Sequence, residues 1–62
     1  MKILIAEDDL TSREFLHRLL SQYGECDLAA DGVEALDAFL VSLQENKRYD
    51  LICLDIMMPR VD

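Results

Sequence analysis

The chain has 62 residues, enough for one domain at most, and its hydrophobic fraction of 52% is typical of globular rather than disordered proteins. It carries 13 acidic and 6 basic residues, and the net charge of −7 argues against binding to nucleic acids or anionic lipids. No segment resembles a signal peptide or approaches the ~20 apolar residues of a membrane span, so a cytoplasmic protein without membrane contact is expected.

The first predicted elements are a strand and a helix. The apolar run 3–6 is typical of a strand that is buried on both faces, and it stops at three consecutive acids. Either Asp9 or a capping box formed by Thr11 and Glu14 then starts a helix that ends near Gly24. Five side chains at helical spacing give this helix its apolar stripe: Phe15, Leu16, Leu19, Leu20 and Tyr23.

A second strand, a second helix and a third strand follow. Residues 26–30 favour a strand, although Asp27 interrupts the apolar pattern. A helix is predicted over 33–45, and its apolar face is made by Val33, Leu36, Phe39, Leu40 and Leu43. The run 51–54 is apolar throughout and predicts a third buried strand, which ends at Asp55.

Alternating strands and helices predict an α/β fold with a parallel sheet and crossover helices. In strand order 2-1-3, the carboxyl ends of the first and third strands are neighbours, at the place where open sheets of this kind bind ligands. Glu7 and Asp8 follow the first strand, and Asp55 ends the third. We therefore expect these three acids to converge in one crevice.

Such a cluster of carboxylates suits a divalent cation, because neighbouring carboxylates resist simultaneous ionisation. Magnesium takes one or two carboxylates and keeps positions for water and phosphate oxygens. Asp55 is then the candidate nucleophile, since an aspartate can form an aspartyl phosphate. The alternative is that Glu7, Asp8 and Asp9 form a solvated turn or cap the following helix, and that Asp55 is an ordinary loop acid.

Three segments, in the right order and spacing, resemble the receiver domains of response regulators. Residues 3–9 resemble the opening strand and acidic pair, and residues 30–36 look like the A-x-G-x-E-A-L stretch at the start of the second helix. Residues 49–62 are similar to the phosphoacceptor segment Y-D-L-I-h-x-D-x-x-M-P-x-x-D-G. The resemblance covers the whole chain.

This resemblance implies a flavodoxin-like fold with strand order 2-1-3-4-5, of which the chain would hold strands 2-1-3. It implies a two-component phosphoprotein in which Asp55 is phosphorylated by a histidine kinase, a phosphotransfer protein or a small phosphodonor. It implies Mg²⁺ bound by Glu7, Asp8, Asp55 and the backbone carbonyl of Met57. Such a domain is not an enzyme beyond catalysing its own phosphotransfer and dephosphorylation.

The chain departs from the family in length, so residues 1–62 are interpreted as a single receiver domain that is truncated at its C-terminal side. The family's Thr or Ser after strand 4 and its Lys after strand 5 have no counterpart, which keeps open a structural fragment with an inert site. An aspartate-nucleophile phosphatase is disfavoured, because Met57 stands where such enzymes need a second acid. The third strand would form an apolar edge, so self-association is expected.

Overall fold

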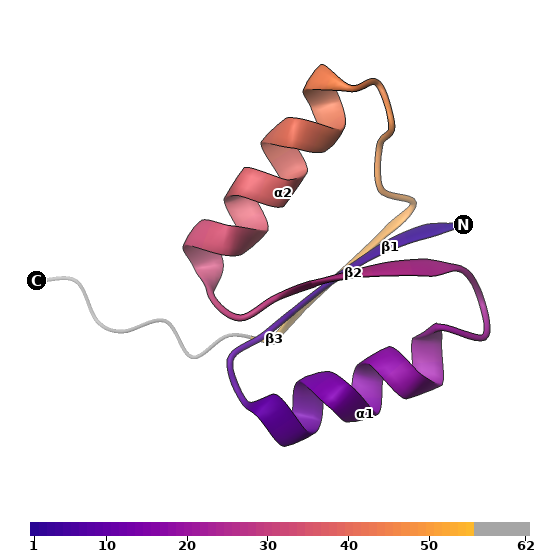
Figure 1. The fold of residues 1–62 in the computed structure, drawn as a ribbon, viewed down its shortest axis with the longest axis vertical. Coiled ribbons are helices and arrows are strands. Elements are labelled where there is room, and N and C mark those ends of the chain that lie inside the picture. Colours follow the sequence, from indigo (N-terminus) through magenta and orange to yellow (C-terminus); the bar gives the residue numbers. More distant parts are fainter. Residues whose placement is uncertain (56–62) are drawn as a thin grey trace, which may run out of the picture.

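All five expected elements are present in the computed structural model, which describes residues 1–55. They follow the predicted order along the chain (Figure 1): β1 (Lys2–Glu7), α1 (Leu10–Leu20), β2 (Glu25–Ala29), α2 (Gly32–Gln44) and β3 (Leu51–Asp55). The predicted bounds of the strands and of the second helix differ from these by a single residue at most.

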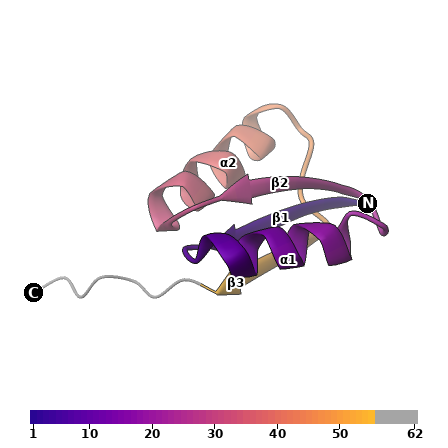
Figure 2. The same ribbon diagram turned by 60° about the horizontal axis from the view of Figure 1, so that its bottom comes forward.

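The three strands form one parallel sheet in the order β2-β1-β3, which confirms the topology predicted for a flavodoxin-like receiver fragment. Figures 1 and 2 show α1 on one side of the sheet and α2 on the other, as right-handed crossovers require. The carboxyl ends of β1 and β3 therefore lie side by side. Neither helix in this part of the chain is long and apolar enough to cross a membrane.

The central strand β1 is the core of the molecule. Ile3, Leu4, Ile5 and Ala6 are at most 1% exposed. Leu4 and Ala6 pack with residues of β2 and α2, and because side chains alternate along a strand, Ile3 and Ile5 face the α1 side. An unbroken apolar run suits this position, since both faces of β1 are covered by helices.

Helix α1 begins with Asp9 as its N-cap, so the Thr11–Glu14 capping box is not used. The Asp9 carboxylate accepts a hydrogen bond of 2.9 Å from the backbone N–H of Ser12. The helix ends at Leu20, and Gly24 is therefore not the C-terminal stop that the sequence predicted.

Gly24 has a different role, because its backbone lies against the start of β1. A Cβ atom at position 24 would stand 2.1 Å from the carbonyl oxygen of Met1, and Gly24 does not need a positive φ angle. The same Met1 oxygen accepts a hydrogen bond of 2.9 Å from the N–H of Glu25, which starts the pairing of β2 with β1.

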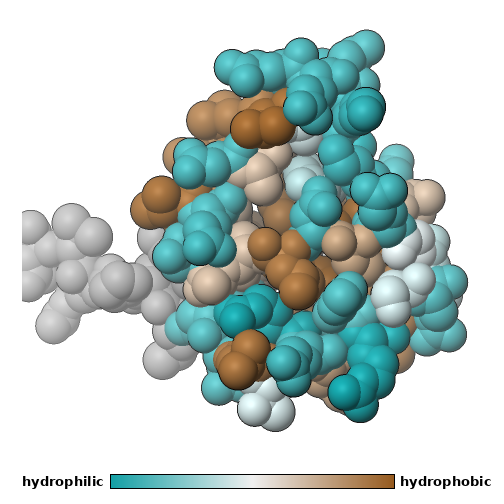
Figure 3. Space-filling model, viewed as in Figure 1, coloured by the Kyte–Doolittle hydropathy of each residue, from teal (hydrophilic) through white to brown (hydrophobic). Residues whose placement is uncertain are grey.

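The predicted apolar face of α2 does not pack on the sheet. The buried residues of this helix are Ala35 and Ser42, and Ala38 is half-buried against the same core. Small side chains allow α2 to approach β1 and β2 closely, which turns the larger ones outwards. Exposed fractions of 37–72% are found for Val33, Leu36, Phe39, Leu40 and Leu43, and Figure 3 shows apolar surface over α2.

In α1 the predicted stripe is divided rather than buried as a unit. Leu16 and Leu20 are half-buried towards the sheet, whereas Phe15 and Tyr23 are 64% and 63% exposed. The predicted stripe is wider than the face that is buried, because a single helix on a three-stranded sheet can bury only the side chains that point directly at it.

The strand β3 contrasts with β1, since it pairs with β1 alone and neither helix packs against it within residues 1–55. Leu51, Ile52 and Leu54 are 40%, 39% and 66% exposed. The sequence predicted this strand as buried on the basis of its apolar run, and in the described part of the chain that prediction is wrong.

Candidate phosphoacceptor and cation site

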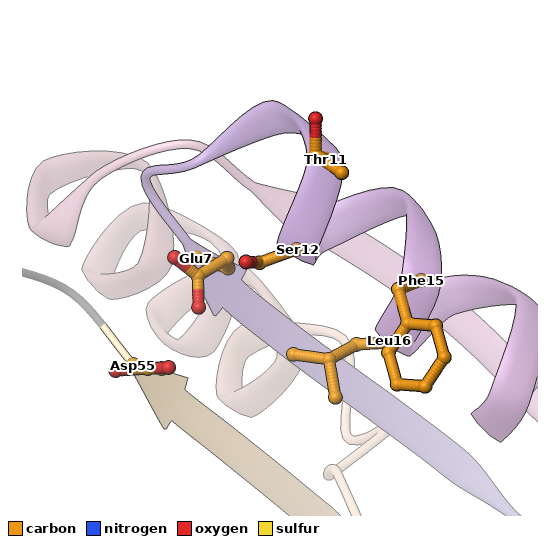
Figure 4. Close-up of a pocket in the computed structure, with 6 residues that line it drawn as sticks. All are labelled: Glu7, Thr11, Ser12, Phe15, Leu16 and Asp55. Atoms are coloured by element: carbon orange, nitrogen blue, oxygen red, sulfur yellow. The ribbon is translucent and has the colours of Figure 1, made fainter.

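Two of the three candidate acids stand directly opposite each other. Glu7 and Asp55 are register partners at the carboxyl ends of the neighbouring parallel strands β1 and β3. Figure 4 shows their carboxyl groups at adjacent strand tips, next to the first turns of α1. Strand order 2-1-3 therefore brings together two of the three acids expected to converge, Glu7 and Asp55, although this order by itself assigns neither residue a role.

Glu7 is a buried acid with one unsatisfied oxygen. Its side chain is 4% exposed, and its Oε1 accepts a hydrogen bond of 3.1 Å from the N–H of Asp9. Its Oε2 is also buried and has no hydrogen-bond partner among residues 1–55. An unpartnered buried carboxylate oxygen is unfavourable, and a bound cation would satisfy it.

The electrostatics of Glu7 agree with this geometry. The N–H of Asp9 lowers the pKa of Glu7, but burial and the carboxyl groups of Asp55 and Asp8 outweigh it and raise the pKa above its usual value. Asp8 itself is exposed, on the turn that leaves β1. Asp55 and Asp8 thus both act on Glu7, which favours either a proton or a nearby cation over a free negative charge on its carboxyl group.

An open groove of about 420 Å³ adjoins these acids. Glu7 and Asp55 lie at one end, and four residues of α1 form its side (Figure 4): Thr11, Ser12, Phe15 and Leu16. The hydroxyl of Ser12 points towards Glu7 in this view. The beginning of α1 also brings the positive end of its helix dipole to the groove, which favours an anion such as a phosphoryl group.

The donor set fits magnesium in chemistry but is not a complete cage. Within residues 1–55, no group of three His, Cys, Asp or Glu side chains is arranged to hold a metal ion. Magnesium binds one or two carboxylates and retains several waters. The carboxylates of Glu7 and Asp55 suit this pattern, and the Oε2 of Glu7 has no hydrogen-bond partner in the part of the chain that the structure describes. The backbone carbonyl of Met57, expected as a further ligand, lies outside the described residues.

Sequence reasoning missed Arg13, whose side chain binds the backbone at the tip of β1. Its guanidinium Nη1 donates a hydrogen bond of 2.9 Å to the backbone carbonyl of Glu7. The signal was the position of Arg13 one turn into a helix that starts directly after the acids. The contact fixes the peptide next to the candidate ligand and does not involve the Glu7 carboxyl group.

Comparison with known proteins agrees with the observed fold. The family model of the response regulator receiver domain matches residues 3–62. The chain is 49% identical over its whole length to the response regulator MprA of Mycobacterium sp. (strain KMS), 48% to that of Mycobacterium avium (strain 104) and 46% to that of Mycobacterium tuberculosis (strain CDC 1551 / Oshkosh). It spans 25% of the length of these relatives, and no solved structure matches it. The chain belongs to the response regulator receiver domain family.

Proposed function

We propose that this chain is the phosphoacceptor part of a two-component response regulator and acts in the cytoplasm. Asp55 accepts the phosphoryl group, and Mg²⁺ is held by Glu7, Asp8, Asp55 and the backbone carbonyl of Met57. The observation that carries this proposal is the pairing of two carboxyl groups on neighbouring strands. Glu7 is buried and has one oxygen without a hydrogen-bond partner among residues 1–55, and Asp55 is exposed. Family membership supports it, because aspartate phosphorylation with magnesium is general to receivers.

The difference in exposure suggests different roles for the two carboxyl groups. Buried Glu7 suits a cation that approaches from the groove, whereas exposed Asp55 suits attack on a donor at the surface. A carboxylate oxygen of Asp55 forms the new bond to phosphorus, while the bond from phosphorus to the donor histidine nitrogen breaks and the freed imidazole takes up a proton. Magnesium, when bound, neutralises charge on the transferred group.

The partner proposed for this reaction is a histidine kinase or a phosphotransfer protein, as family membership implies. The net charge of −7 argues against direct contact of this segment with nucleic acids or membranes. The chain is not a classical enzyme in this proposal, because Asp55 is modified itself and turns over only by its own dephosphorylation.

The direct test is incubation of the chain with MgCl₂ and acetyl phosphate, followed by intact-mass measurement. We expect the wild type to gain one phosphoryl group, Asp55→Asn to gain none, and Asp37→Asn, which alters an exposed acid of α2, to match the wild type. Removal of Mg²⁺ with a chelator should abolish the gain. An unlabelled wild type would favour a structural fragment with an inert site, and continuous release of phosphate would favour an aspartate-nucleophile phosphatase.

We also infer that the chain self-associates through β3, with a second copy as the occupant. The outer edge of β3 is unpaired within residues 1–55, and Leu51, Ile52 and Leu54 are each at least 39% exposed. An edge of this kind recruits another strand, and two identical edges can pair around a two-fold axis. Light scattering should show a dimer that Ile52→Lys dissociates; a wild-type monomer at high concentration would contradict this.

A further inference from the structure

The apolar pattern of β3 gives little information about its register on β1. Leu51, Ile52, Cys53 and Leu54 are all apolar, so a slip of one residue would exchange one apolar side chain for another. Register is strongly specified where one face of a strand is buried and a slip would move its apolar side chains to the solvent face. A slip would nevertheless place Leu54 or residue 56 opposite Glu7 and separate the two acids. Another feature must therefore hold the register.

Asp50, the residue before β3, makes a reciprocal contact with Lys2 at the entry of the strand pair. The N–H of Asp50 donates to the carbonyl of Lys2 at 2.7 Å, and the N–H of Lys2 donates to the Asp50 carboxylate at 2.7 Å. Both distances are short, and hydrogen bonds to a carboxylate are about twice as strong as neutral ones. The Asp50 carboxylate thus accepts from a backbone N–H of β1 at the start of the β1–β3 pair.

The contact is specific to one register because strand residues point their peptide groups alternately to either side. Met1 directs its carbonyl to Glu25 of β2, and Lys2 directs its own groups to Asp50. By the same alternation Ile3 turns back towards β2. If β3 slipped by one residue towards the tip of β1, the Asp50 carboxylate would face Ile3, whose N–H points to β2. A slip in the other direction would place it opposite Met1, whose carbonyl is bound by Glu25.

The Lys2 side chain ties the same end to the chain that leads into β3. Its Nζ donates to the carbonyl of Lys47 at 2.9 Å and lies 4.7 Å from the centre of the Tyr49 ring. The Tyr49 hydroxyl donates to the carboxylate of Asp27 on β2. The amino end of the sheet is therefore connected across all three strands.

We propose that Asp50 is a positioning residue that sets the register of β3 on β1 and so keeps Asp55 opposite Glu7. The functional value of this register rests on the proposed phosphoacceptor role. The role of Asp50 in setting the register does not depend on that proposal. Asp50 acts from the opposite end of β3, and five residues of strand place it about 16 Å from Asp55. Asp50 touches neither the groove nor the candidate cation site.

The test uses the 62-residue chain and three variants: Asp50→Ala removes the acceptor, Asp50→Asn keeps an oxygen without the charge, and Asp37→Ala is the matched control. Nuclear Overhauser contacts between the backbones of β1 and β3 report the register, and hydrogen exchange reports its stability. Binding of Mn²⁺ reports whether the two acids remain together. The first two measurements involve neither cation nor phosphoryl group, so they fail independently of the proposed function.

We expect Asp50→Ala to speed exchange of the β3 amides by about tenfold and to weaken Mn²⁺ binding by a similar factor, with new or missing β1–β3 contacts. Asp50→Asn should restore the register and part of the protection, and Asp37→Ala should match the wild type. If Asp50→Ala does not fold, Asp50→Asn decides, since faster β3 exchange than in Asp37→Ala supports the proposal. Unchanged contacts and exchange in Asp50→Ala, or in Asp50→Asn where only that variant folds, would overturn it.

Discussion

The two ends of the sheet differ in whether their polar groups have hydrogen-bond partners. At the amino end, Lys2, Asp27, Tyr49 and Asp50 form a network in which each charged or hydroxyl group has a partner. At the carboxyl end, Glu7 is buried beside other acids and keeps an oxygen without a partner in the described part of the chain. The satisfied end gives stability and register, and the unsatisfied end retains unfavourable charge that a ligand can relieve. This contrast can be tested at either end.

The largest effect is expected from Glu7→Gln, which changes the unsatisfied end. Loss of the buried charge should weaken Mg²⁺ binding by about 10- to 100-fold, as measured by calorimetric titration. Without Mg²⁺ the variant should melt at a higher temperature than the wild type, because repulsion with Asp55 and Asp8 is removed. The matched control is Glu14→Gln on the exposed side of α1. A variant that binds Mg²⁺ as tightly as the wild type would remove Glu7 from the site.

A smaller effect is expected at the satisfied end from Tyr49→Phe, which deprives Asp27 of its donor. The cost in the free energy of unfolding should be about 1–2 kcal/mol at neutral pH, measured by urea unfolding. Burial and the hydrogen bond to Asp27 raise the pKa of Tyr49 to about 12, above the ordinary value of 10.0.

This shift gives the Tyr49 contribution a definite dependence on pH. The folded state holds the phenol proton more tightly, so the contribution is fully present below pH 10 and is lost as the pH rises towards 12. The difference between wild type and Tyr49→Phe should therefore shrink over this window. A difference that stays constant up to pH 12 would show that the hydroxyl proton is not involved.

The smallest effect is expected from Asp31→Ala. This variant distinguishes an acid that caps a helix from the acids that are proposed to bind Mg²⁺. Asp31 caps α2 by accepting from the N–H of Glu34 at 2.8 Å, so its loss should cost about 1 kcal/mol. Affinity for Mg²⁺ should stay the same, since Asp31 follows β2 and does not line the groove. A parallel loss of Mg²⁺ affinity would mean that Mg²⁺ binding depends on the combined charge of all the acids at this edge and not on Glu7 and Asp55 alone.

The sequence was sufficient for the strands and for the meeting of Glu7 with Asp55, because both follow from apolar runs and parallel topology. It failed for the contact face of α2, where hydrophobicity pointed to Leu36 and Leu40 but close approach to the sheet selects Ala35 and Ser42. Side-chain size decides this packing, and an apolar pattern does not encode it.

The network at the amino end was out of reach for a related reason. Asp27 was interpreted only as an interruption of a strand, and its partner Tyr49 is 22 positions away. The contacts of Tyr49 with Asp27 and of Asp50 with Lys2 form only when the three strands are assembled. Likewise, the sequence alone does not distinguish the neighbouring acids Glu7 and Asp8. Glu7 is buried because β1 extends through it, and Asp8 is exposed because it follows the strand.

The crowding of Gly24 against Met1 has a consequence for how the chain tolerates change. In a library of single substitutions, position 24 should behave like an interior site although it lies in a turn, while its neighbour Tyr23 should accept most replacements. The intolerance would come from the space that a methyl group requires and not from backbone conformation. A bulky residue there would push the first peptide aside and loosen the strand on which both halves of the sheet are assembled.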